Sequence, residues 1–176
     1  MRSRNVLAAP VRRVNTALVV MSGDAYADAL FEDCWAALTS DSIENFYPSF
    51  RAWYYGKVIP DVRLGRRQLS VVRSFDRVIA LAIAKNDEKE KKICTIWVDP
   101  IARGRGNGAR IIDQSLKFLG TDHPLITVPE EKNKYFLSLM QKYRFEKKQS
   151  IRGLYRPNAV EVIYNEQFKV SDESRN

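Results

Sequence analysis

Residues 98–109 of this 176-residue chain read VDPIARGRGNGA, and they join two segments of different character. The run before them, 92–98 (KICTIWV), is rich in β-branched and aromatic residues and predicts a strand. The run after them, 106–119, places its apolar residues on one stripe at helical spacing. The sequence therefore predicts a glycine-rich connection that leads from a strand into the N-terminus of an amphipathic helix.

The glycines of this connection give it the chemistry of an anion-binding site. Glycine lets a backbone turn tightly and aim its N–H groups at a ligand, and the first-turn amides of a helix have no partners within that helix. The positive end of the helix dipole favours an anion at the same place, and Arg103, Arg105 and Arg110 add charge nearby. The alternative is a glycine-rich turn that binds no ligand.

The residues on either side of the connection predict the rest of one α/β domain. The strands before it are separated by short turns and are most simply antiparallel. The predicted strands are 16–21, 68–74, 77–85, 92–98, 125–128, 145–155 and 159–164, and the predicted helices are 25–38, 48–58 (closed by Pro60 and Gly65), 106–119 and 133–143. We divide the chain into a flexible basic arm at 1–15, a single domain at 16–168 and a disordered tail at 169–176.

Two common phosphate-binding motifs do not match the spacing of the glycines. The dinucleotide fingerprint G-x-G-x-x-G is absent, and so is the Walker Gly-Lys followed by Ser or Thr. The pattern that fits is R-x-x-G-x-G, formed by Arg103, Gly106 and Gly108 after Val98-x-Pro100. In this pattern, placed after an antiparallel meander, the chain resembles the GNAT superfamily of acyl-CoA-dependent N-acyltransferases, whose pyrophosphate loop has the form V-x-P-x-x-R-G-x-G-x-G.

The resemblance implies a fold and a cosubstrate. The expected fold is α/β of the α+β type, a mixed and mostly antiparallel central sheet with splayed parallel strands, flanked by helices. The pantetheine arm of acetyl-CoA should lie between the splayed strands 93–98 and 125–128, with its pyrophosphate on the backbone amides of the glycine loop. A backbone N–H of the splayed strand should face the thioester carbonyl. The residues implied for acetyl-CoA binding are Ile96, Trp97, Val98, Arg103, Gly104, Arg105, Gly106, Asn107, Gly108, Ala109 and Asn133.

The last predicted helix departs from the family pattern at the position of the general acid. The family often continues N-x-x-A-x-x-x-Y-x-x-x-G-F, and residues 133–145 here read NKYFLSLMQKYRF. Met140 occupies the tyrosine position and cannot protonate a departing thiolate. Tyr143, one helical turn away, is our candidate for the general acid, with Tyr135 and Ser138 as alternatives. A further alternative is that no acid is needed, because a CoA thiol is a tolerable leaving group.

The sequence leaves the general base and the acceptor open. The strand 92–98 carries no carboxylate, and His123 is expected to be structural or exposed. Basic residues around the second helix favour an acidic acceptor or a phosphate backbone. The candidate bases are Asp41, Glu44, Asp61 and Glu161, and the basic residues are Arg51, Lys57, Arg63, Arg66 and Arg67.

Composition fits a globular protein of a reducing compartment. Hydrophobic residues make up 45% of the chain and charged residues 28%. There is no apolar run of the ~20 residues that a membrane helix needs, and the basic N-terminus lacks the apolar core of a secretory signal. Cys34 and Cys94 show no disulfide or metal spacing, so we expect no metal and a cytoplasmic location. The net charge of +8 favours anionic partners, or reflects only a need for solubility.

These observations predict an N-acetyltransferase that moves an acetyl group from acetyl-CoA to an amine on a small molecule, a peptide or protein, or a tRNA. The alternative is a catalytically silent module that binds CoA or nucleic acid, suggested by Met140 and by the net charge. The expected partners are acetyl-CoA and an amine acceptor, which could be acidic or linked to nucleic acid. No membrane partner is expected, and a homodimer is left open.

Overall fold

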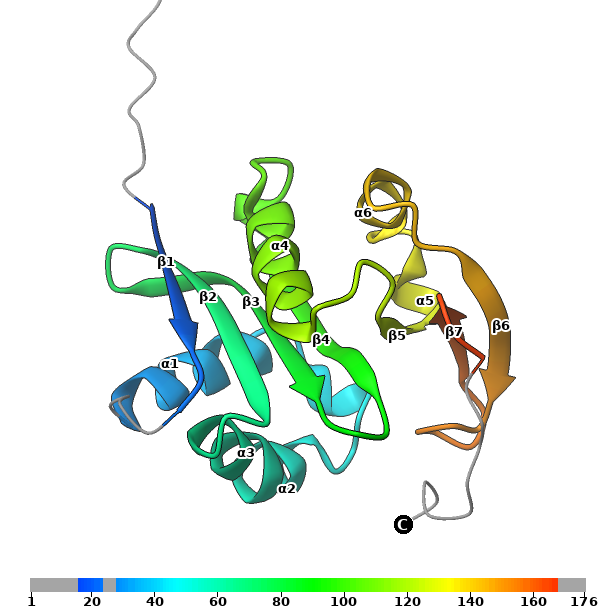
Figure 1. The fold of residues 1–176 in the computed structure, drawn as a ribbon, viewed down its shortest axis with the longest axis horizontal. Helices are drawn as coiled ribbons and strands as arrows, with labels where there is room; N and C mark the ends of the chain where they lie inside the picture. Colours follow the sequence, from blue (N-terminus) through cyan, green and yellow to red (C-terminus); the bar gives the residue numbers. More distant parts are fainter. Residues whose placement is uncertain (1–15, 24–27, 168–176) are drawn as a thin grey trace, which may run out of the picture.

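The computed structural model describes residues 16–23 and 28–167 (Figure 1). The predicted basic arm at 1–15 and the predicted tail at 169–176 lie outside the described residues, as do the first residues of the helix predicted at 25–38.

Seven strands form one sheet in the order β1-β2-β3-β4-β5-β7-β6. Neighbouring strands are antiparallel except β4 and β5, which are parallel. This confirms the predicted fold class, a mostly antiparallel sheet with one parallel pair. The strands are β1 Thr16–Met21, β2 Arg67–Ser74, β3 Arg77–Asn86, β4 Lys91–Val98, β5 Leu125–Pro129, β6 Lys147–Arg152 and β7 Val160–Tyr164.

Helices cover both faces of the sheet (Figure 1). One face carries α1, α2 and α3 with the π-helical turn η2, and the opposite face carries α4. Among the described residues, no helix is long and apolar enough to cross a bilayer. The helical elements are α1 Asp28–Thr39, η1 Ile43–Asn45, α2 Phe50–Trp53, η2 Tyr54–Val58, α3 Ile59–Arg63, η3 Pro100–Ala102, α4 Asn107–Leu119, α5 Glu130–Asn133 and α6 Leu137–Lys142.

Strand β3 shows why the two faces differ. Its side chains alternate, so Leu81 and Ile83 pack under α1 to α3, whereas Ala80 and Ala82 face α4. The small alanines let α4 lie close to the sheet, where Ile111 is fully buried. This packing fixes the N-terminus of α4 next to the end of β4.

Two predicted helices differ from the structure. Pro60 does not end the second helix, because the chain continues from α2 through η2 into α3. The widened π-helical turn lies just before Pro60, whose missing N–H falls in the first turn of α3. The predicted helix 133–143 is broken at 134–136, where the hydrogen bonds tighten: the N–H groups of Tyr135 and Phe136 donate to carbonyls only three residues back.

Candidate functional site

The parallel strands β4 and β5 pair over only two residues. Lys92 lies opposite Leu125 and Ile93 opposite Ile126, and beyond these pairs the strands diverge. A cavity of about 500 Å³ opens between them, lined by both strands, the glycine loop and the start of α6. The splay that the resemblance implied is therefore present in the structure.

A β-bulge contributes to this divergence. Ile83 of β3 lies opposite Thr95 and Ala84 lies opposite Ile93, so Cys94 is the extra residue on β4. A bulge bends its strand and increases the local twist. Cys94 and Thr95 both line the cavity as a result.

The glycine loop has a defined shape. Gly104 and Gly106 adopt φ angles of 72° and 79°, in the region that favours glycine. The Asn107 side chain is buried and donates to the Ala102 carbonyl at 3.0 Å, while the Asp99 carboxylate accepts from the Ile101 N–H. Hydrogen bonds within the loop thus hold the first turn of α4 against the cavity.

Most residues predicted for acetyl-CoA binding border this cavity, and three do not. Arg105 is exposed and the side chain of Asn107 is buried within the loop. The Asn133 Oδ1 accepts a hydrogen bond of 2.7 Å from the Tyr164 hydroxyl, which ties it to β7. The predicted residues that line the cavity are Ile96, Trp97, Val98, Arg103, Gly104, Gly106, Gly108 and Ala109.

Positive charge gathers at the rim of the cavity. Arg103, Lys132 and Lys142 all line it. The Arg103 Nε donates to the Val98 carbonyl at 3.1 Å, and its guanidinium lies 5.5 Å from the centre of the Tyr135 ring. Arg103 is therefore held at the glycine loop.

The predicted general acid lies elsewhere. The Tyr143 hydroxyl is 3.0 Å from the Ala109 carbonyl and 2.5 Å from the Asp113 carboxylate, and Tyr143 does not line the cavity. Burial and the hydrogen bond to Asp113 raise the pKa of this hydroxyl well above its ordinary value. Met140 is 2% exposed and packs in the core. Tyr143 thus bridges α6 to α4, a geometry that does not support the predicted role.

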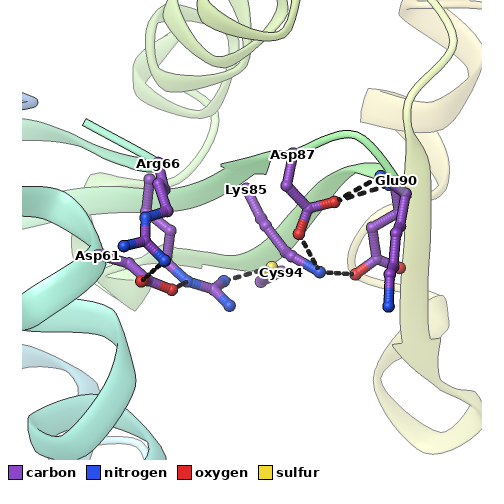
Figure 2. A network of polar contacts seen from close by, with 8 residues as sticks. Asp61, Arg66, Lys85, Asp87, Glu90 and Cys94 are labelled. Carbon is purple, nitrogen blue, oxygen red and sulfur yellow. Dashed lines mark hydrogen bonds and ion pairs between the residues drawn. The ribbon is translucent and has the colours of Figure 1, made fainter. Parts of the chain in front are cut away.

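The basic cluster of the second helix is largely neutralised. Arg67 Nε lies 3.1 Å from the Asp61 carboxylate, and Arg66 pairs with the same carboxylate at 3.9 Å. Arg67 also donates to the sulfur of Cys94 at 3.3 Å. Figure 2 shows Asp61, Arg66 and Cys94 of this network. Arg63 pairs with Asp28. Three of the five charges that suggested an acidic acceptor, those of Arg63, Arg66 and Arg67, are therefore paired within the protein.

The four candidate bases lie in different environments. Glu44 is exposed, Asp61 is held by arginines, and Asp41 lines the cavity 3.6 Å from the Lys132 ammonium. Glu161 is 1% exposed on β7, and burial raises its pKa to about 7. Sequence reasoning named Glu161 without being able to place it, and it missed Phe46 and Tyr47, which line the cavity.

No protein-family model matches the sequence, and no curated protein matches it. Solved structures do match. A protein from Desulfovibrio desulfuricans described as an acetyltransferase of the GNAT family has a TM-score of 0.62 and 12% identity, over 84% of this chain and 97% of that chain. Arabidopsis thaliana Naa50 has a TM-score of 0.62 and 16% identity, over 86% of this chain and 99% of Naa50. The ribosomal-protein-S18-alanine N-acetyltransferase from Escherichia coli has a TM-score of 0.59 and 15% identity, over 84% of this chain and 92% of the Escherichia coli protein. The chain therefore has the fold of the GNAT acetyltransferases, as the glycine loop had indicated.

Proposed function

We propose that this protein transfers an acetyl group from acetyl-CoA to an amine. The observation that carries the proposal is the cavity between β4 and β5, which ends at the glycine loop and the first turn of α4. A Cβ placed on Gly104 or Gly106 would meet no atom within 4 Å, so open space lies over the loop. That space suits a pyrophosphate held by backbone N–H groups.

The rest of the cavity suits the pantetheine arm. Beyond Ile93, the edge of β4 that faces β5 has no strand partner among the described residues, so its N–H and C=O groups are available to a ligand. An extended arm with two amides can pair with such an edge. Arg103 adds a charge-assisted contact to the phosphates.

Catalysis in this arrangement is chiefly positioning. Acetyl-CoA supplies an activated thioester, and the protein holds it with the carbonyl near the splay point. Holding two reactants in line lowers the barrier by about 7–11 kcal/mol in favourable cases. No acid is required in this scheme, because water can protonate the departing thiolate.

The acceptor that we propose is the amine of a peptide or protein. The Arabidopsis structure contains the bisubstrate analogue CoA-Ac-MVNAL, and the Escherichia coli protein is named for a ribosomal-protein alanine. In both comparisons, more than nine-tenths of the other protein's length is matched by this chain. Their likeness to this chain supports the acceptor class through the fold alone.

The test combines binding with turnover. Calorimetry should detect acetyl-CoA binding, and thiol release should rise above background with at least one member of a panel of short peptides and small primary amines. If calorimetry detects no acetyl-CoA binding and no thiol release is measured, the proposal is refuted. A second candidate, a silent CoA-binding module, is favoured by Met140 and by the engaged Tyr143 hydroxyl. Tight binding without turnover of any acceptor would select that candidate.

A further inference from the structure

A buried carboxylate oxygen without a partner lies beside the proposed site. Among the described residues, three buried side-chain atoms have no hydrogen-bond partner: Trp97 Nε1, Arg156 Nε and Glu161 Oε2. Trp97 lines the cavity. Glu161 interacts electrostatically with Arg156, and also with Glu131 and Lys92. Buried polar groups are nearly always paired, so an unpaired one calls for an explanation, such as a catalytic role or a bound water.

The strand register places Glu161 next to residues that line the cavity, although Glu161 itself is not one of them. Glu161 lies opposite Pro129 of β5, and Pro129 lines the cavity. Val162 and Tyr164 of β7 face the core under α4, so the alternation of the strand turns Glu161 to the opposite face. Tyr47, which also lines the cavity, interacts electrostatically with Glu161 on that face. The carboxylate therefore lies on the side of the sheet away from α4, next to the splayed strands.

The cations around Glu161 are already engaged. Arg156, from the β6–β7 connection, donates from Nη2 to Glu131 of α5 at 2.5 Å. Lys92 of β4 donates to the Tyr155 hydroxyl at 3.1 Å. Glu131 adds a like charge from α5 and Tyr47 adds an ionisable hydroxyl from the segment after η1. Glu161 is thus close to two cations and hydrogen-bonded through Oε2 to neither.

We propose that Glu161 is the proton acceptor of the acetyl-transfer reaction, reached by the incoming amine through water, since its Oε2 is buried beside the cavity. This inference rests on the proposed function. The amine enters as an ammonium, and Glu161 takes one proton and leaves a neutral amine. The nitrogen lone pair then forms the C–N bond to the thioester carbon, and the C–S bond breaks. The second N–H proton leaves to water, water protonates the departing thiolate, and Glu161 returns its proton to solvent.

Two properties of the site suit this role. A base works best when its pKa is near the working pH, and burial raises the pKa of Glu161 to about 7. The buried Oε2 has no hydrogen-bond partner among the described residues, so its lone pairs can accept a hydrogen bond from a water that connects it to the cavity, which a carboxylate in a complete ion pair would not do. Asp41, the rival carboxylate at the cavity, is paired with Lys132.

The experiment compares E161Q with two matched controls, D41N at the cavity and E44Q on the exposed surface. Turnover is measured from pH 5.5 to 9 with acetyl-CoA and the peptide or amine that the wild type acetylates fastest. We expect E161Q to lower kcat about 100-fold or more at pH 7, the usual contribution of a general base. We expect its acetyl-CoA dissociation constant to stay within twofold, and E44Q to match the wild type.

The pH profile separates catalysis from structure. The wild-type kcat should fall as the pH drops through about 7, and E161Q should lose this inflection. If E161Q keeps the kcat and the pH profile of the wild type, the inference is overturned. It is also overturned if D41N, and not E161Q, loses the inflection. If E161Q does not melt cooperatively, E161M replaces it under the same criteria. Absence of wild-type turnover in the whole panel would refute the proposed function, which is a separate result.

Discussion

Replacing Glu161 by glutamine should stabilise the protein above neutral pH and change little in mild acid. Burial raises the pKa of the folded carboxyl from 4.5 to about 7, and unfolding restores the lower value. Between these pH values the folded protein holds a proton that the unfolded chain releases. The stability of the wild type therefore falls as the pH rises through this window, and the loss is complete above pH 7.

The pKa shift sets the size of the effect. One pKa unit is 1.36 kcal/mol, so a shift from 4.5 to about 7 corresponds to about 3 kcal/mol. Glutamine is neutral at every pH and has a similar volume, so E161Q avoids this penalty while keeping a polar group that needs a partner. We expect E161Q to exceed the wild type in free energy of unfolding by about 2–3 kcal/mol at pH 8.5, and by less than about 1 kcal/mol at pH 5.

Urea unfolding at these two pH values, followed by tryptophan fluorescence, measures the difference without any acceptor. Equal m-values are required, so that the denatured states are comparable. E44Q serves as the control and should show no pH-dependent gain, because Glu44 is exposed. A wild type that is more stable than E161Q at pH 8.5 would refute the reasoning, because Glu161 would then be a paired anion in the folded protein.

Three further predictions concern the cavity and its surroundings. R103A should weaken acetyl-CoA binding about tenfold by calorimetry, the effect of losing about 1.4 kcal/mol, whereas R105A should change it less than twofold because Arg105 does not line the cavity. A thiol reagent should label Cys94 and not Cys34, whose pKa is raised to about 12 by burial and the nearby Asp33, and acetyl-CoA should protect Cys94. Mass spectrometry would identify the labelled residue, and labelling of Cys94 at the same rate with saturating acetyl-CoA would contradict the assigned cavity. Y143F should cost about 1 kcal/mol of stability and leave kcat unchanged, and a large loss of kcat would restore Tyr143 as the general acid.

Local patterns in the sequence were enough to place the strands, the helices and the glycine loop, whereas the splayed mixed sheet was expected from the resemblance to the GNAT superfamily. The strand 92–98 and the helix 106–119 each bury one face, so periodicity alone placed them within a residue of β4 and α4. The glycine φ angles follow from residue type in the same way. Such features depend on neighbours in the chain and are therefore visible in the sequence.

Features that depend on distant contacts were not visible. Tyr143 does lie one turn from Met140, but its hydroxyl is engaged by the Ala109 carbonyl and the Asp113 carboxylate of α4, which are 34 and 30 residues away in the sequence. Asn133 similarly meets Tyr164, a residue 31 positions away. For Glu161 a signal did exist, since a single acid within the apolar run 160–164 (VEVIY) indicates a buried carboxylate. Only the sheet order shows that this carboxylate adjoins β5.

The distribution of the positive charge also bears on the function. Arg63, Arg66 and Arg67 have acidic partners, whereas among the described residues no ion pair is formed by Arg103 or Lys142 at the cavity. Lys132 has one partner, Asp41, at 3.6 Å. Unbalanced charge in a cleft concentrates the local field and speeds the association of an anion. If the proposed acetyl-CoA site is right, part of the net charge of +8 lies where the phosphates would enter. The rate of acetyl-CoA association should then fall with ionic strength more steeply in the wild type than in R103A.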